Sequence, residues 1–221
     1  MIDPIRRGFK WLVWAAVGAA GASAGAAGAP AGEPSSLPAG GARARFVQPE
    51  AEQGTFDEAA VAQRYGAEGT QWILFGGGAA YDLQDSTDLN VNAAYSVFLI
   101  NDVEWLLELG AWYHAQEGDD AASLNPVMEF RWHFFNNGDT SVFLNGGIGV
   151  LFATDEVPDT GTGFDFTPRA GIGMTQRIGR GGSRLIAGLR WHHISNARIN
   201  GEDRNPSRDA PMVYVQFAVP F

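Results

Sequence analysis

Eight segments between residue 70 and the end of the chain alternate apolar with polar residues. In the segment 125–135, for example, Met128, Phe130 and Trp132 are separated by charged residues. Because successive side chains of a strand point to opposite faces, each segment has one apolar and one polar face. The pattern therefore predicts an all-β fold. The predicted strands are Thr70–Tyr81, Leu89–Ile100, Glu104–Ala115, Asn125–Phe135, Ser141–Thr154, Phe164–Arg177, Ser183–Asn196 and Pro211–Phe221.

The polar faces carry charges of both signs, and this decides which way the strands face. A soluble barrel turns its apolar face inward and needs a polar surface, yet none of the eight segments contains lysine. A membrane barrel turns the apolar face to lipid and encloses the charges. We therefore predict an eight-stranded antiparallel transmembrane β-barrel at 70–221, filled by side chains. The predicted paired fillers are Glu104, Glu108, Glu129, Arg131, Arg169 and Arg190.

The connections between the segments support this topology. Short turn-forming links occupy 101–102, 136–139 and 179–182, whereas the links after the first, third, fifth and seventh segments are longer and polar. Outer-membrane barrels have short periplasmic turns and longer external loops. The last segment also ends on Phe221, which resembles the C-terminal signature of bacterial outer-membrane barrels. We therefore expect both ends of the barrel to lie in the periplasm.

The first 29 residues have the pattern of a signal peptide. Basic residues at 6, 7 and 10 precede an apolar stretch at 11–22, and small residues at 22–24 and 29–31 offer cleavage sites. A single helical anchor is the alternative, but the Gly/Ala-rich core is weakly hydrophobic for that role. Export to the outer membrane is therefore predicted, with residues 30–69 forming a flexible linker that includes one short helix at Thr55–Tyr65.

Composition excludes several classes of function. The 221 residues include no cysteine, so no disulfide or thiolate metal site can form. The formal net charge of −10 disfavours nucleic acid as a partner. His114 and His133 are expected in the barrel interior rather than on a metal. We expect no cofactor. Four acidic residues are irregularly spaced, and we expect them to be solvated loop charges rather than the ligands of a Ca²⁺ ion. Those residues are Asp155, Glu156, Asp159 and Asp165.

His193 and Ser195 continue the apolar face of the segment 183–196, which is an unusual place for polar residues. Leu189 and Trp191 lie on the same face. In an ideal strand the Cα atoms of His193 and Ser195 are about 6.6 Å apart, so modest bending lets the imidazole reach the hydroxyl as a general base. A nucleophile and its base on a surface made for hydrocarbon suit an enzyme whose substrate is a lipid.

A Ser-His site of this kind needs an acid that orients the imidazole. Asp209 begins the last strand with the same parity as the outward Val213, and is the first candidate. Glu202 and Asp203, in the intervening loop, are the alternatives.

The segment His193-Ile194-Ser195-Asn196-Ala197, followed by Asn205-Pro206-Ser207-Arg208-Asp209, resembles the PagL family of outer-membrane lipid A 3-O-deacylases. The resemblance implies an eight-stranded barrel, with Ser195 as nucleophile, His193 as base and Asp209 where the family's acid, usually Glu, would sit. It also implies that Asn196 contributes to the oxyanion hole. It covers residues 70–221, and only the final thirty carry specific motifs.

Two residues depart from the family's pattern. Arg198 stands where the family commonly has Gly, and an Arg there could contact lipid phosphate. Ser207 replaces a turn Gly, so the path of this loop is less well defined by the sequence. The implied reaction removes an ester-linked hydroxyacyl chain from lipid A, without a metal or nucleotide. A structural or adhesive barrel without catalysis and a phospholipase on the same scaffold are the alternatives, and a homodimer is left open.

Overall fold

The computed structural model describes residues 64–82 and 86–221. The predicted signal peptide, most of the predicted linker and nearly all of its short helix lie outside these residues. No helix in the described ranges is long and apolar enough to cross a membrane.

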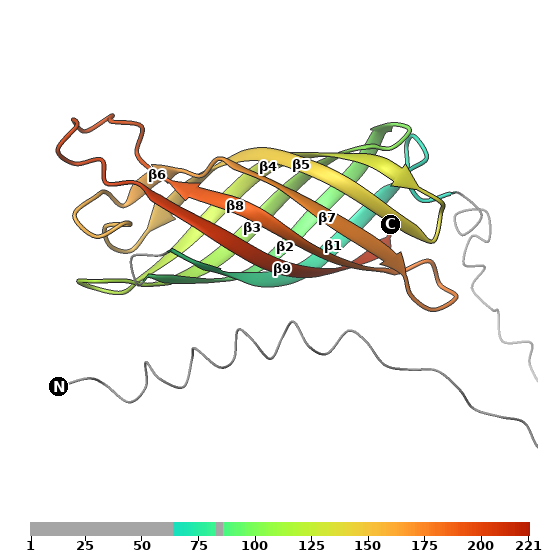
Figure 1. Cartoon of the computed structure of the whole chain (residues 1–221), viewed down its shortest axis with the longest axis horizontal. Coiled ribbons are helices and arrows are strands. Elements are labelled where there is room, and N and C mark those ends of the chain that lie inside the picture. Colours follow the sequence, from blue (N-terminus) through green and yellow to red (C-terminus); the bar gives the residue numbers. More distant parts are fainter. Residues whose placement is uncertain (1–63, 83–85) are drawn as a thin grey trace, which may run out of the picture. The chain divides into compact units, whose positions relative to one another are not determined.

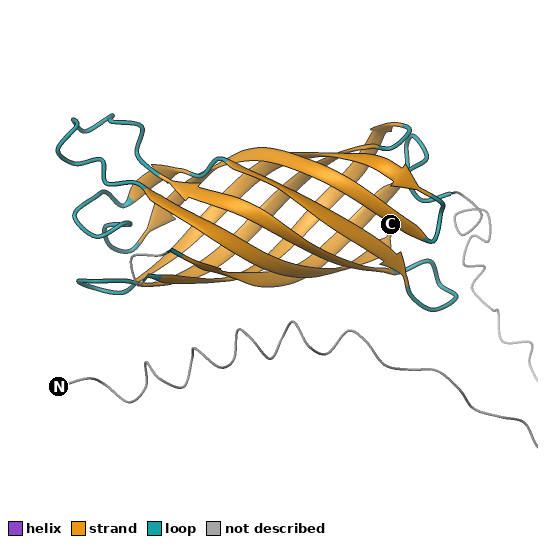
Figure 2. Ribbon diagram, in the orientation of Figure 1, coloured by secondary structure: helices purple, strands orange, loops and turns teal. Residues whose placement is uncertain are grey.

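The described chain folds into one closed sheet of antiparallel strands (Figures 1 and 2). The strands are β1 (Gln71–Tyr81), β2 (Thr87–Ile100), β3 (Val103–Ala115), β4 (Ala121–Asn136), β5 (Thr140–Ala153), β6 (Phe164–Phe166), β7 (Arg169–Arg177), β8 (Arg184–Ile194) and β9 (Arg208–Pro220). β1 to β5 each pair with the next strand along the chain, β5 pairs with both β6 and β7, and β7, β8 and β9 pair in succession. β1 pairs with β9 to close the ring. The prediction of an eight-stranded antiparallel barrel is confirmed, with the sixth strand in two pieces.

The break between β6 and β7 falls at Pro168, which has no N–H to donate to a neighbouring strand. The register does not shift across the break: Arg169 pairs with His192 and Phe166 with Ser195 on the side of β8. β6 and β7 are therefore one barrel strand with a local interruption beside Ser195.

Side chains alternate between the outer face of the barrel and its interior, the lumen. Along β9 every second residue from Arg208 to Ala218 is buried, while those between are exposed. Period-two burial of this kind, with the apolar residues outside, is the pattern of a membrane barrel.

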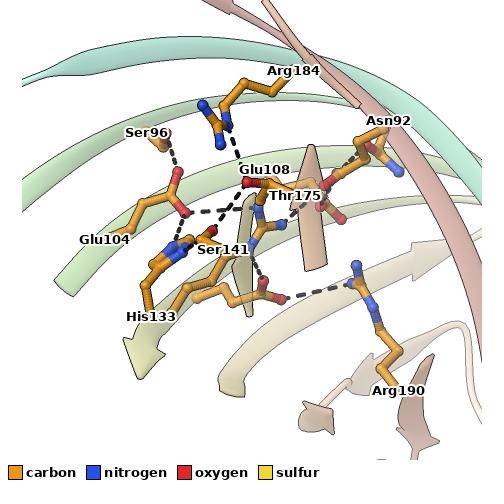
Figure 3. Close-up of polar contacts among 12 residues, drawn as sticks. Asn92, Ser96, Glu104, Glu108, His133, Ser141, Thr175, Arg184 and Arg190 are labelled. Carbon is orange, nitrogen blue, oxygen red and sulfur yellow. Dashed lines mark hydrogen bonds and ion pairs between the residues drawn. The ribbon is translucent and has the colours of Figure 1, made fainter. Parts of the chain in front are cut away.

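The lumen holds a network of ion pairs and hydrogen bonds, part of which Figure 3 shows. Glu129 bonds to Arg131 and pairs with Arg169, at 2.9 and 2.8 Å, and Arg169 also bonds to Glu108 at 2.8 Å. Glu104 accepts from Ser96 at 2.6 Å. The predicted fillers therefore pair with one another, which compensates their loss of hydration.

The two ends of the barrel differ. One end, the turn end, carries the short turns and the C-terminus; the other, the loop end, carries the longer connections (Figure 1). Tyr65 closes the turn end: its ring packs edge-on against Trp72 and Phe98, with the Arg184 guanidinium 3.7 Å from the ring centroid. Burial raises the pKa of Tyr65 above its ordinary value.

Candidate active site

The backbone around Ser195 is held from both sides at the loop end. On one side Ser195 exchanges two hydrogen bonds with Phe166, of 3.1 and 2.8 Å, and His193 N–H donates to the Pro168 carbonyl at 3.1 Å. On the other side His193 lies directly opposite Asp209 in the ladder between β8 and β9. Cross-strand partners have closely spaced Cβ atoms, so this register brings the imidazole to the carboxylate.

The side chains of Ser195, His193 and Asp209 form one chain of hydrogen bonds. His193 Nε2 lies 2.9 Å from Ser195 Oγ, and His193 Nδ1 lies 2.8 Å from Asp209 Oδ1. Both distances suit a relay in which the acid orients the base and the base contacts the hydroxyl. The structure therefore brings together three residues that the sequence analysis singled out.

These groups are reached from outside the barrel. The side chains of His193 and Asp209 are 19% and 56% exposed, and Ser195 is half-buried. Their neighbours of opposite parity, His192 and Ile194, are buried in the lumen. The hydroxyl and the imidazole thus lie on the face of β8 that also carries its exposed apolar side chains.

The alternative acids lie elsewhere. Glu202 is exposed and pairs with Arg198 at 3.5 Å, and Asp203 is exposed in the same loop. Among the described residues, Asp209 is the carboxylate that contacts His193.

Trp191 is a fourth member of the cluster, and the sequence analysis did not assign it a role there. Its indole Nε1–H donates to Asp209 Oδ1 at 2.7 Å, the same oxygen that His193 contacts. The signal was present in the pattern, because Trp191 has the parity of His193 and lies next to it on that face.

Asn196 is buried and its side chain holds the loop between β8 and β9. The amide Nδ2 donates to Thr162 Oγ1 at 3.2 Å and to the Arg204 carbonyl, while Oδ1 accepts from Arg198 N–H at 2.9 Å. Within the described residues, the main-chain N–H groups of Asn196 and Ala197 have no hydrogen-bond acceptor. The side-chain amide is thus occupied, and the two main-chain donors beside Ser195 are not.

Ala197 and Arg198 have left-handed backbones, with φ of 53° and 64°. Residues with a Cβ adopt this region at a cost of about 1–2 kcal/mol. Glycine adopts it freely, so the backbone at Arg198 has the geometry that a glycine would favour.

An apolar groove of about 340 Å³ runs over the outer face near β6. Its lining includes Leu107, Met128, Ile148 and Phe166. Phe166 is the ladder partner of Ser195, so one residue that lines the groove is a cross-strand neighbour of this serine.

A second Ser-His-Asp chain lies inside the lumen. His114 Nδ1 is 2.8 Å from Asp88 Oδ1, and His114 Nε2 is 2.8 Å from Ser123 Oγ. Asp88 also accepts from Arg208 at 2.7 Å. The sequence analysis placed His114 inside the barrel but not its partners, although their inward parity and the pairing of β2 with β3 could have indicated Asp88.

No group of three or more His, Asp or Glu within residues 64–82 and 86–221 is arranged to hold a metal ion. Two of the acids considered for Ca²⁺ have other contacts: Glu156 pairs with Arg204 at 2.6 Å, and Asp165, in β6, accepts from Thr162.

Residues 69–218 match the family model described as "Lipid A 3-O-deacylase (PagL)". The chain belongs to the PagL family. It is therefore a member of a family of lipid A deacylases, which are hydrolases.

Solved structures agree on the fold. The crystal structure of the outer membrane enzyme PagL has a TM-score of 0.53 and 18% sequence identity, and the match covers 67% of this chain and 99% of that one. Neisserial surface protein A has a TM-score of 0.51 and 12% identity, covering 69% and 96% of the two chains. The fold is thus that of outer-membrane barrels. A comparison with curated proteins found no match.

Proposed function

We propose that this PagL-family chain hydrolyses the ester that links a 3-O-hydroxyacyl chain to the sugar of lipid A, using Ser195 as nucleophile. The observation that carries the proposal is the hydrogen-bond chain from Ser195 Oγ through His193 to Asp209, with spacings of 2.9 and 2.8 Å. A serine is activated when a base contacts its hydroxyl and a third group orients the base.

In this reaction His193 Nε2 takes the proton of Ser195 as Oγ attacks the ester carbonyl carbon. The bond to the sugar oxygen then breaks, and His193 returns the proton to that oxygen. Water, deprotonated by His193, attacks the acyl-serine, and the bond to Ser195 Oγ breaks as His193 returns the proton to that oxygen, which releases the hydroxy fatty acid. Asp209 remains ionised and stabilises the imidazolium in both halves.

Asn196 contributes to the oxyanion hole through its main chain. Its side-chain amide is committed to Thr162 and Arg204, whereas the N–H groups of Asn196 and Ala197 have no acceptor in the described part of the chain. Donors fixed in advance near a developing negative charge stabilise the transition state.

The surroundings of Ser195 suit a lipid in the outer leaflet. In outer-membrane barrels the longer loops face outward, so the site at the loop end lies at the level of that leaflet. The groove that Phe166 helps to line offers an apolar surface to an acyl chain. Arg198, which is exposed on the adjoining turn, supplies a cation for a lipid A phosphate.

The test is to incubate the purified barrel with lipopolysaccharide and measure the mass of the lipid A. We expect loss of one hydroxyacyl chain, and no loss with His193→Ala, in a variant that keeps the gel mobility of the folded barrel. Unchanged lipid A would contradict the proposal and favour a structural or adhesive barrel. Release of fatty acid from phospholipid instead would reassign the substrate to phospholipids.

A further inference from the structure

The carboxylate of Asp209 depends on two donors that share one oxygen. Oδ1 accepts from His193 Nδ1 at 2.8 Å and from Trp191 Nε1 at 2.7 Å. Within the described residues no Arg or Lys pairs with Asp209, because the neighbouring Arg208 points into the lumen toward Asp88. The indole N–H is thus the second donor that stabilises the negative charge of this carboxylate.

The register explains how Trp191 reaches the acid. His193 lies opposite Asp209, and Trp191 lies opposite Pro211, so Trp191 and Asp209 are diagonal neighbours across β8 and β9. Diagonal neighbours are within reach of a long aromatic side chain. The Trp191 ring also lies 5.4 Å from the His193 ring, centroid to centroid. One side chain therefore contacts both the acid and the base.

The lumen provides an internal comparison for this arrangement. Asp88 Oδ1 likewise contacts a histidine, His114, and a second donor, which is Arg208 at 2.7 Å. On the outer face, where lipid surrounds the strands, a charged guanidinium is costly. An indole has one N–H donor on an apolar ring, which suits the boundary between lipid and water. Trp191 thus occupies the place that an arginine takes in the interior.

We propose that Trp191 is a positioning residue for the reaction. Its N–H fixes the carboxylate of Asp209, which then holds His193 with Nε2 toward Ser195. Without that donor the exposed carboxylate rotates, and the imidazole spends less time in the orientation that accepts the serine proton. This inference rests on the proposed function for its natural substrate, but the activation of Ser195 is measurable without lipid A.

The variant Trp191→Phe removes the N–H and keeps an aromatic ring. Trp132→Phe is the matched control, because Trp132 is an exposed outer-face tryptophan near the turn end, in ring contact with Phe134. We expect kcat for lipopolysaccharide to fall about tenfold in Trp191→Phe, as for loss of a hydrogen bond to a charged group, with KM unchanged. Trp132→Phe should retain the wild-type rate.

A double-mutant cycle separates positioning from packing. If Trp191 acts through Asp209, the variant Trp191→Phe/Asp209→Asn has the same kcat as Asp209→Asn alone, because the orienting carboxylate is already lost. A further fall of equal size in the Asp209→Asn background would overturn the proposal. Gel mobility of the folded barrel is measured for all variants.

A serine-directed fluorophosphonate gives a readout that does not involve lipid A. We expect Trp191→Phe to be labelled about tenfold more slowly than the wild type and Trp132→Phe, since labelling requires the same activated oxygen. Equal labelling of the two variants would overturn the role of Trp191. If the wild type is labelled rapidly but leaves lipid A intact, the proposed substrate is wrong while these rates still decide the role of Trp191.

Discussion

Two Ser-His-Asp chains in this barrel have nearly the same geometry and opposite surroundings. On the outer face, Ser195 and Asp209 lie 2.9 and 2.8 Å from His193; in the lumen, the corresponding distances at His114 are both 2.8 Å. The side chains of His193 and Asp209 are 19% and 56% exposed, whereas those of His114 and Asp88 are 0% and 1% exposed. Spacing alone therefore does not make a nucleophile, because a substrate must also reach it.

The acids of the two chains also differ in their second partner. Asp88 is held by Arg208 within an ion network, which makes it part of the stabilising interior. Asp209 is held by Trp191 at the edge of the lipid-facing surface. Loss of the interior acid removes the nearer of the two carboxylates, Asp88 and Asp82, that pair with buried Arg208, while loss of the outer acid disturbs a site that solvent reaches.

The largest expected difference is between the two serines. Ser195→Ala should lower kcat by about 10⁵-fold, since removing a nucleophile of this kind eliminates nearly all catalysis. Ser123→Ala should leave the rate unchanged, because its hydroxyl is enclosed in the lumen. The rates of both variants are measured by mass spectrometry of the hydroxy fatty acid released from lipopolysaccharide. If Ser123→Ala loses activity while its barrel remains folded, the expected difference between the two serines is wrong.

The two acids should separate activity from stability. Asp209→Asn should lower kcat by about 10⁴-fold, with a small effect on unfolding because the pair is exposed. Asp88→Asn should lower the free energy of unfolding by about 3 kcal/mol, because it breaks a buried ion pair and removes the carboxylate nearer to Arg208. Unfolding in urea measures the free energy of unfolding of each variant, and kcat is measured on its folded fraction. Equal effects of both variants on kcat would mean that the interior network is coupled to the outer site.

The smallest expected effect concerns Arg198. Arg198→Gly should raise the free energy of unfolding by about 0.5–1 kcal/mol, because relief of the left-handed strain exceeds the entropic cost of glycine. It should also raise KM for bisphosphorylated lipid A more than for its monophosphorylated form. Ala197→Gly is the control, with the same backbone change and no lost charge. If both variants change KM equally, the guanidinium does not contact phosphate.

Much of the fold could be predicted because period-two alternation is a local property. The predicted strand at 164–177 is the instructive case: its register is continuous, but Pro168 divides it, since a residue without N–H cannot complete the ladder. The two outer positions of His193 and Ser195 followed from the same alternation. Asp209 could be ranked above Glu202 by parity, whereas the contact itself needed the register of β8 against β9.

By itself, the sequence determined the strands, their polar and apolar faces, and the placement of a histidine and a serine on the apolar one, because each is set by neighbours in the chain. Only the tertiary structure decided which acid meets His193, that Trp191 shares its oxygen, and that the side chain of Asn196 is occupied by loop contacts. Those facts depend on hydrogen bonds between residues that are not neighbours in the chain, which are fixed by the register of β8 against β9 and by the path of the loops. Closure of the barrel enclosed a second Ser-His-Asp chain, for which the alternation of residues indicated the inward position but not the contacts.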